Sequence, residues 1–383
     1  MQEEKENYLK ITCKKDDVCY NEIMKKMYET VNEEIEKAVV FCPIDKGADK
    51  DFQFAEIRRL CESANLEVAE IFYQDIKALN RRTIIGTGKL EEIKSFVKEN
   101  GIDVLVVDFK LTGSQLKNLS DELGVKVLDR ILLIIDIFAC NAKSNEGKIE
   151  VKLAQNKYLL TRLSSMQGSQ GRFGGAGVGM RGPGETKLEL DRRKLEAEIL
   201  TLKKEIEKIK NARAVNRNAR IKAGIKSVVI GGYTNAGKSS LFNLLTRDEI
   251  YVQDKLFATL ETTSRRMFLG EYKYCILTDT VGFISKLPHE LVESFASTLE
   301  EIKDADLILH VVDVSDKNYK RNIEITNEIL DDIHATKKRI IVLNKTDLLS
   351  GPIEVRENEI PFSVKKKYNL EKLKELIKKS LED

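Results

Sequence analysis

The sequence predicts an α/β protein in three parts: a small N-terminal α/β domain, an antiparallel helical hairpin with a glycine-rich loop, and a C-terminal α/β domain with a mostly parallel sheet flanked by helices. Three observations support this division. Apolar runs first alternate with helical patterns, two helices with apolar stripes then flank a glycine-rich segment, and alternation resumes after them. A chain of 383 residues is also long enough for two or three domains.

Residues 1–35 are polar and carry both signs of charge, and we assign no function to this N-terminal extension. The N-terminal domain is expected over residues 36–147. Its apolar runs are Ala38–Ile44, Val68–Tyr73, Val104–Val107 and Val125–Leu128, and its helical patterns are Asp51–Ala64, Leu90–Glu99 and Ser114–Leu123. This alternation predicts a largely parallel sheet. Gly86 to Lys89 lacks the spacing of a phosphate loop, and we interpret it as a tight turn that caps the next helix.

The helical hairpin is expected over residues 148–223. Its first helix, from Lys148 to Ser165, carries leucines on one face. The second helix runs from about Glu185 to Asn211, and its apolar residues have heptad spacing: Leu188, Leu195, Leu202 and Ile209, with Ile199 and Ile206 at the second seam position. Eight glycines lie in the 17 residues of 168–184, so we place this flexible loop at the tip of the hairpin.

Two stretches of the hairpin carry only positive charge. Five basic and no acidic residues lie between Val151 and Gly184, and seven basic and no acidic residues lie between Lys208 and Lys226. A surface of one sign is typical of nucleic-acid binding. The alternative is a solvated linker face with a flexible loop. The formal net charge of +2 does not by itself predict a nucleic-acid partner.

The composition is that of a globular protein, with 42% hydrophobic and 33% charged residues. The six cysteines are scattered without a C-x-x-C pair, which predicts reduced thiols rather than a zinc site or disulfides. The N-terminus lacks the apolar core of a signal peptide. The most apolar stretch, Ile131 to Cys140, is interrupted by Asp136 and is too short to cross a bilayer. We therefore expect a cytoplasmic protein without a membrane span, and a monomer.

A phosphate-binding loop is predicted near the start of the C-terminal domain, which spans residues 224–383. The motif G-x-x-x-x-G-K-[ST] lies between an apolar run and a helical pattern, which is the context that it requires. Lys238 is expected to reach the β- and γ-phosphates, and the Ser239 hydroxyl is expected to ligate Mg²⁺. The predicted nucleotide-binding residues of this loop are Gly232, Tyr233, Thr234, Asn235, Ala236, Gly237, Lys238, Ser239 and Ser240.

A guanine-binding motif, Asn344-Lys345-Thr346-Asp347, follows the apolar run Ile340–Leu343. The Asp347 carboxylate can accept hydrogen bonds from N1–H and the exocyclic amine of guanine, whereas adenine lacks this pair of donors. Ser363 and Val364 lie where the loop that backs the base is expected, although Ser-Val-Lys departs from the commoner Ser-Ala-Lys. The motif therefore predicts GTP and GDP as the bound nucleotides.

Two further segments are expected to contact the γ-phosphate and the metal ion. Asp279 should hold Mg²⁺ through water, and the Gly282 N–H should donate to the γ-phosphate. Thr259 is the first candidate for the switch threonine that completes the Mg²⁺ shell, with Thr262 and Thr263 as alternatives. The predicted catalytic residues are thus Lys238, Thr259 and Gly282, and the predicted metal ligands are Ser239, Thr259 and Asp279. Both segments would be ordered by the γ-phosphate and released on hydrolysis.

Phe283 occupies the position at which many GTPases carry a glutamine that orients the attacking water. A phenyl ring cannot hydrogen-bond water in this way, so we expect slow hydrolysis by the isolated protein and a need for a stimulator. Asn235 could ligate K⁺ near the phosphates, or it could be present because asparagine tolerates the turn geometry. His310 is expected in the core and His289 in a local structural role, so we propose neither as a catalytic base.

These motifs together resemble the HflX family of translational GTPases. The segments that carry the resemblance are Arg181–Lys187 with Asp191–Arg193, Gly232–Ser239, Phe257–Leu260, Asp279–Ile284, and Val127–Arg130 with Asp136–Ala139. The resemblance covers roughly residues 36–383. It implies an N-terminal HflX domain, a helical hairpin and a GTPase domain. After the helix Leu370–Leu381 the chain stops, so we expect it to lack the extra C-terminal domain of some members.

The resemblance further implies binding to the large ribosomal subunit, with the glycine-rich loop near the peptidyl-transferase region. It implies ribosome-stimulated GTP hydrolysis and the splitting or rescue of stalled ribosomes under stress. One alternative is a GTP-dependent assembly or hibernation factor in which hydrolysis only times release. Another is a switch for a protein or membrane partner, with the hairpin as a protein-docking coiled coil.

Overall fold

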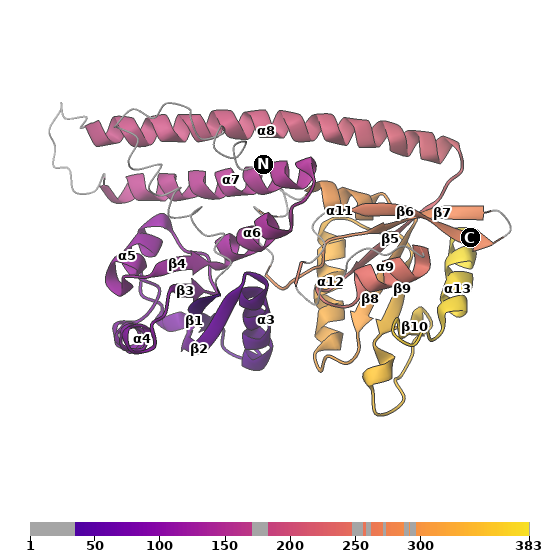
Figure 1. Cartoon of the computed structure of the whole chain (residues 1–383), viewed down its shortest axis with the longest axis horizontal. Helices are drawn as coiled ribbons and strands as arrows, with labels where there is room; N and C mark the ends of the chain where they lie inside the picture. The colour runs from indigo at the N-terminus through magenta and orange to yellow at the C-terminus, as the bar shows by residue number, and fades with distance from the viewer. Residues whose placement is uncertain are drawn as a thin grey trace, which may run out of the picture.

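The computed structural model describes residues 35–170, 183–246, 256–257, 262–270, 273–286, 291 and 296–382, and it has the predicted α/β fold. Two sheets lie next to each other, and the long helix α8 (Pro183–Lys222) runs along both of them (Figure 1). The N-terminal extension and the central part of the glycine-rich loop lie outside the described residues.

The N-terminal sheet has four parallel strands in the order β2–β1–β3–β4. They are β1 (Glu36–Ile44), β2 (Leu66–Asp75), β3 (Val104–Val107) and β4 (Lys126–Asp129). Parallel pairing requires long crossovers, which are built by α3 (Lys50–Ser63), α4 (Thr87–Asn100) with the short 3₁₀ helix η1 (Ile76–Ala78), and α5 (Gly113–Leu123). Gly86 is the N-cap residue of α4, which confirms the predicted turn.

Both faces of this sheet are buried, which explains why β1 and β3 are continuous apolar runs rather than alternating ones. Helices α4 and α5 cover one face, where Phe41 and Leu105 pack against Leu119. Helices α3 and α6 (Arg130–Asn141) cover the other face. The apolar stretch judged too short to cross a membrane is therefore the buried helix α6, and Asp129 caps it by accepting from Leu132 N at 2.9 Å.

The helical hairpin consists of α7 (Asn145–Gln170) and α8, which lie side by side (Figure 1). Both helices are longer than the sequence pattern predicted. The predicted heptad seam is the packing surface, because Leu195, Ile199, Leu202 and Ile206 of α8 are buried against α7. The hairpin is thus held by a narrow apolar stripe, as in a coiled coil.

The C-terminal sheet has six strands in the order β10–β9–β8–β5–β7–β6, and only β6 is antiparallel to its neighbour. The strands are β5 (Ser227–Gly232), β6 (Thr263–Gly270), β7 (Lys273–Asp279), β8 (Leu307–Asp313), β9 (Arg339–Asn344) and β10 (Glu359–Pro361). Helices α9 (Lys238–Thr246) and α13 (Leu370–Glu382) pack on one face, and α11 (Ala296–Lys303) and α12 (Tyr319–Asp332) pack on the other. A 3₁₀ helix, η2 (Thr346–Leu348), follows β9.

Several basic residues of α8 and of the turn that follows it make ion pairs instead of forming a surface of one sign. The pairs are Lys210 with Glu300 (2.7 Å), Arg213 with Glu146 (2.6 Å), Arg217 with Asp304, and Lys226 with Asp306 (3.7 Å). The acidic partners belong to α7, to α11 and to the turn after α11, so a count of charges along α8 does not detect them. Within the described residues, Lys208, Arg220 and Lys222 make no ion pair.

Among the helices that the structure describes, none is both long and apolar enough to cross a membrane.

Candidate nucleotide-binding site

The predicted phosphate loop connects β5 to α9 and needs backbone conformations that favour glycine. Gly232 has a φ of 143°, and a Cβ atom added there would lie 2.2 Å from the carbonyl oxygen of Val311. Gly237 has a φ of 90°, and its added Cβ would lie 2.4 Å from Asn344 Nδ2. Asn235 has a φ of 61°, a left-handed conformation that asparagine tolerates better than most residues. The turn therefore explains both glycines and gives a structural reason for this asparagine.

Lys238, the first residue of α9, is buried, and its Nζ donates to the carbonyl oxygen of Tyr233 at 2.8 Å. Burial lowers the pKa of Lys238 to about 8, and the negative charge of Asp279 partly opposes this shift. A buried ammonium group at a helix N-terminus is well suited to bind phosphate, whose charge would restore full protonation of the lysine.

The two predicted Mg²⁺ ligands of the phosphate loop and β7 lie together. Ser239 Oγ donates to Asp279 Oδ2 at 2.6 Å. A hydroxyl and a carboxylate are the hard oxygen donors that Mg²⁺ prefers, so this pair fits the ion. Thr259 lies outside the described residues, whereas the alternative Thr263 is the first residue of β6 and pairs with Asp279 in the ladder.

Gly282 lies against the phosphate loop. A Cβ atom added to Gly282 would lie 2.7 Å from Lys238 Nζ and 2.8 Å from the Cα of Thr234, so only glycine fits there. The next residue is tied to the same loop, because Phe283 N donates to Gly232 O at 3.0 Å and Thr234 N donates to Phe283 O at 2.8 Å. The segment therefore brings Gly282 next to the buried lysine.

The ring of Phe283 points into the core and not into the site. It is 2% exposed and packs among Val229, Ile302 and Ile308 beneath α11. This placement agrees with the expectation that Phe283 packs and does not orient water. His310 is buried in β8, where burial lowers its pKa to about 3, and neither ring nitrogen has a partner within the described residues. His310 is thus the core residue that the sequence predicted, and His289 lies outside the described residues.

The predicted guanine-binding residues follow β9 and contact the phosphate loop. Asn344 Nδ2 donates to Ala236 O at 2.9 Å, and its Oδ1 accepts from Val364 N at 3.2 Å. Lys345 Nζ donates to Asn235 O at 3.1 Å and forms an ion pair with Asp313 at 2.6 Å. Asn344 and Lys345 therefore join the segments that would hold the base and the phosphates.

The third predicted guanine-binding residue, Asp347, accepts a hydrogen bond from Ser363 Oγ at 2.5 Å. This bond and the nearby charges of Lys366 and Lys365 hold the pKa of Asp347 below its ordinary value, so the carboxylate is ionised and can accept hydrogen bonds from a base. Ser363 also accepts from Lys366 N at 3.1 Å, which orders the loop that carries Val364. Ser240 follows Ser239 in the first turn of α9.

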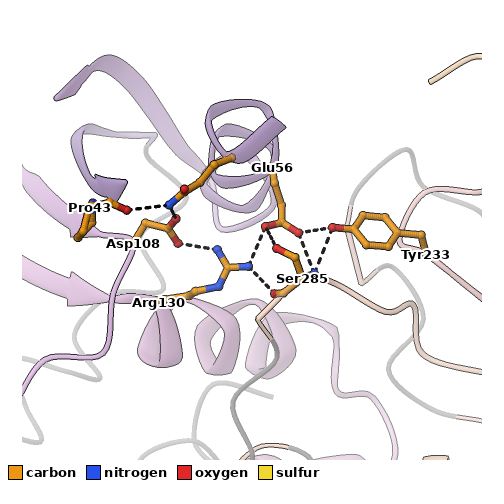
Figure 2. Close-up of polar contacts among 7 residues, drawn as sticks. Pro43, Glu56, Asp108, Arg130, Tyr233 and Ser285 are labelled. Carbon is orange, nitrogen blue, oxygen red and sulfur yellow. Dashed lines mark hydrogen bonds and ion pairs between the residues drawn. The ribbon is translucent and has the colours of Figure 1, made fainter. Parts of the chain in front are cut away.

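The sequence did not reveal four residues that connect this site to the N-terminal domain. Glu56 of α3 accepts hydrogen bonds from Tyr233 and from Ser285, which lies three residues after Gly282 (Figure 2). Arg130 of α6 donates to Glu56 and to the carbonyl oxygen of Ser285. In the sequence, Arg130 belongs to a segment of the family resemblance, and Tyr233 belongs to the phosphate loop. No motif indicated Glu56 or Ser285, because their partners are distant in sequence.

Comparison with known proteins gives matches along nearly the whole chain. Three protein-family models match in order: "GTP-binding GTPase N-terminal" over residues 51–139, "GTP-binding GTPase Middle Region" over 141–220, and "50S ribosome-binding GTPase" over 227–345. A solved structure of the protein SsGBP in complex with GDP is 29% identical, with a TM-score of 0.50, and the match covers 90% of this chain and 98% of that one.

Several curated relatives carry the name GTPase HflX. The protein from Caldanaerobacter subterraneus subsp. tengcongensis is 46% identical over 347 residues, which cover 90% of this chain and 81% of the relative. The protein from Escherichia coli strain K12 is 42% identical over 303 residues, covering 79% of this chain and 71% of the relative. These matches show that the chain belongs to the HflX family of GTPases, whose P-loop domain hydrolyses GTP.

Proposed function

We propose that this GTPase binds the large ribosomal subunit, that the ribosome stimulates its hydrolysis of GTP to GDP and phosphate, and that it splits or rescues stalled ribosomes under stress. The observation that carries the proposal is that Lys238, Gly282 and the pair Ser239–Asp279 lie together. The loop predicted to bind guanine lies next to them. The family model described as "50S ribosome-binding GTPase" supports the choice of partner. The proposed cellular location is the cytoplasm, and the proposed form is a monomer.

The residues of the site have distinct proposed roles. Backbone N–H groups from Gly232 to Ser240 and the Lys238 ammonium bind the phosphates, and Asp347 selects guanine. P-loop GTPases generally use Mg²⁺ with the nucleotide, and the ion neutralises charge on the β- and γ-phosphates. Ser239, Asp279 and Thr259 would hold this ion, and the Gly282 N–H would donate to the γ-phosphate.

The burial of the Phe283 ring supports the proposed dependence on a stimulator, because no side chain at this position can orient the attacking water. Asn235 would contribute to a K⁺ site beside the phosphates. Faster hydrolysis in KCl than in NaCl, lost in Asn235→Ala, tests this role. Equal rates in both salts would mean that Asn235 is present only for its left-handed backbone.

The proposed domains are the N-terminal extension (1–35), the N-terminal domain (36–147), the hairpin (148–223) and the GTPase domain (224–383). Contact with ribosomal RNA is assigned to the glycine-rich loop and to the cations of α8 without an acidic partner in the described residues, Lys208, Arg220 and Lys222. Replacement of these three cations by alanine should weaken large-subunit binding and reduce its salt dependence. A matched control replaces Lys210, Arg213 and Arg217, which are paired within the protein.

The first experiment measures GTP hydrolysis by the purified protein, alone and with large ribosomal subunits, with Lys238→Ala as the control. Strong stimulation that disappears in the control supports the proposal. Equal rates with and without subunits would contradict it and leave the hairpin with another partner. An assay of intact ribosomes then separates splitting from binding: an assembly or hibernation factor would bind without releasing subunits.

A further inference from the structure

A buried polar network connects the N-terminal domain to the nucleotide site (Figure 2). Its centre is the carboxylate of Glu56 in α3, with Arg130 at the start of α6 beside it, and these residues are only 6% and 4% exposed. Two residues of the C-terminal domain complete it: Tyr233 of the phosphate loop, and Ser285 shortly after Gly282. The network therefore contacts two segments that are proposed to bind phosphate.

Ser285 uses all of its polar groups in this network. Its hydroxyl donates to Glu56 Oε2 at 2.5 Å, and its backbone N–H donates to Glu56 Oε1 at 3.0 Å. Its carbonyl oxygen accepts from Arg130 Nη2 at 2.8 Å. Three hydrogen bonds to two buried, charged side chains fix both the position and the orientation of this residue.

Tyr233 ties the phosphate loop to the same carboxylate. Its hydroxyl donates to Glu56 Oε1 and accepts from Ser285 N at 3.1 Å. Burial opposes the ionisation of Glu56, but the charge of Arg130 and the hydrogen bonds from Ser285 and Tyr233 outweigh it, so the pKa of Glu56 is lowered. The carboxylate therefore stays charged and accepts these bonds at physiological pH.

The N-terminal domain holds Arg130 in place independently of the nucleotide site. Arg130 Nη1 donates to Asp108 Oδ1 at 2.5 Å, just after β3. Asp108 in turn accepts from Gln53 Nε2 at 2.6 Å, and this amide also contacts Pro43 O at 3.3 Å. Both sides of the guanidinium group are thus occupied by carboxylates, and the network has a rigid base in α3, β1 and β3.

Each of the three residues after Gly282 is held by protein contacts. Phe283 is bonded through its backbone to the phosphate loop, and Ile284 is buried in the core cluster that includes α3 and α6. Ser285 is fixed by Glu56 and Arg130. The position of Gly282, in contact with Lys238, is the result of these restraints.

We propose that Glu56 and Arg130 are positioning residues of the GTPase site, which act through Ser285 to hold Gly282 beside Lys238 so that both groups can bind the γ-phosphate. This inference rests on the proposed role of Gly282. It assigns part of the site to a domain that carries none of the nucleotide-binding motifs. Because GDP has no γ-phosphate, the network should determine how strongly the protein prefers GTP over GDP.

A network that only held the two domains together would behave differently. Its loss would weaken the fold and would lower the affinities for GDP and for GTP in parallel. A positioning role affects only the nucleotide that contacts Gly282. The ratio of the two affinities therefore separates the two roles.

The test uses Ser285→Ala and Glu56→Gln in the full chain. The first variant removes only a hydroxyl group, and the second keeps the shape of the side chain but removes its charge. We expect a non-hydrolysable GTP analogue to bind at least about fivefold more weakly in both variants, while GDP affinity changes less than about twofold. In steady-state hydrolysis, kcat/KM for GTP should fall by a similar factor.

Each variant has a matched control within the N-terminal domain. Ser120→Ala removes a hydroxyl group that donates to Val125 O, and Glu122→Gln removes a carboxylate that pairs with Arg82. Neither residue contacts the nucleotide site, so both controls should keep the wild-type preference for the analogue over GDP. Thermal unfolding identifies a variant that has lost its fold, and Ser285→Ala carries the test if Glu56→Gln does not fold.

Parallel losses of GDP and analogue affinity would overturn the inference, as would unchanged affinities in both variants. Tighter binding of the analogue would overturn it too, because the network would then hold Gly282 away from the γ-phosphate. Gly282→Ala distinguishes this failure from failure of the proposed site. If Gly282→Ala weakens analogue binding and the network variants do not, only the positioning inference falls.

Discussion

At the scale of single residues, His310 is the clearest case of a buried group whose energetics depend on pH. It lies in β8 with 1% exposure, and burial and the nearby positive charges of Arg339 and Lys238 lower its pKa to about 3. Below the ordinary histidine pKa of about 6.5, the unfolded chain takes up a proton that the folded protein cannot. Stability is therefore lost as the pH falls from about 6.5 toward 3.

His310→Leu should remove this part of the acid sensitivity. Between pH 7.5 and pH 5.5, the free energy of unfolding of the wild type should fall by about 1.4 kcal/mol more than that of the variant. Denaturant unfolding at the two pH values gives both differences, and the values at pH 7.5 correct for any change in packing. Equal losses in both proteins would mean that the imidazole accepts a proton in the folded state.

At the same scale, Asp347 is the residue that we propose selects the base. Asp347→Asn replaces an acceptor of two hydrogen bonds by a group that presents one donor and one acceptor. GDP should bind about 30-fold more weakly or worse, which corresponds to about 2 kcal/mol. Xanthosine diphosphate, which has a carbonyl in place of the guanine amine, should gain affinity in the variant. Parallel losses for both nucleotides would indicate that the loop had been disrupted and that Asp347 does not select the base.

At the scale of elements, α8 serves two partners. Its N-terminal half packs on α7 through the heptad seam. Its C-terminal half forms ion pairs with acidic residues of α7, of α11 and of the turn after α11. Because α11 follows the Gly282 segment in the chain, the ion pairs link the hairpin to the part of the GTPase domain that is expected to change with the nucleotide. The pairs with α11 and the turn after it are largely exposed, so each contributes little to stability on its own.

Leu195→Ala tests the seam. The side chain is 1% exposed between Leu159 and Leu163, so its truncation should lower the free energy of unfolding by about 2–4 kcal/mol. Leu200→Ala is the matched control on the same helix, because Leu200 is 56% exposed, and it should change stability by less than about 0.5 kcal/mol. Denaturant unfolding measures both effects. Similar losses in the two variants would mean that α8 does not pack through the heptad positions.

The elements also show what sequence could and could not predict. Strands β1, β3 and β9 were predicted nearly to their ends, because strands buried on both faces are continuous apolar runs. The phosphate loop was predicted because its chemistry depends on neighbours in sequence. The ion pairs of Lys210, Arg213 and Arg217 on α8 were not predicted, since their acidic partners lie up to 90 residues away. The Glu56 network was missed for the same reason.

At the scale of the whole molecule, the two domains share a hydrophobic cluster. The cluster beneath α3 and α6 includes Leu256, Phe257, Ile284 and Leu291 of the C-terminal part of the chain. The ring of Phe257 meets that of Phe138 edge to face, with centroids 4.7 Å apart. An apolar contact of this kind, together with the buried network, resists independent motion of the two domains more than a polar interface would. We therefore expect both domains to unfold in one transition.

Phe138→Ala should separate that transition into two. The truncation removes a buried ring from the interdomain cluster and should lower stability by about 3–5 kcal/mol, mainly by weakening the contact between the domains. Phe72→Ala is the matched control: Phe72 also has an edge-to-face partner, Phe96, but this pair lies within the N-terminal domain. Calorimetry without and with GDP measures this effect. GDP binds only the nucleotide-binding domain, so the transition that it stabilises belongs to that domain. In Phe138→Ala, GDP should raise the unfolding temperature of one of two transitions. In Phe72→Ala, GDP should raise the temperature of the single transition. A single transition in both variants would mean that the polar network alone is sufficient to couple the domains.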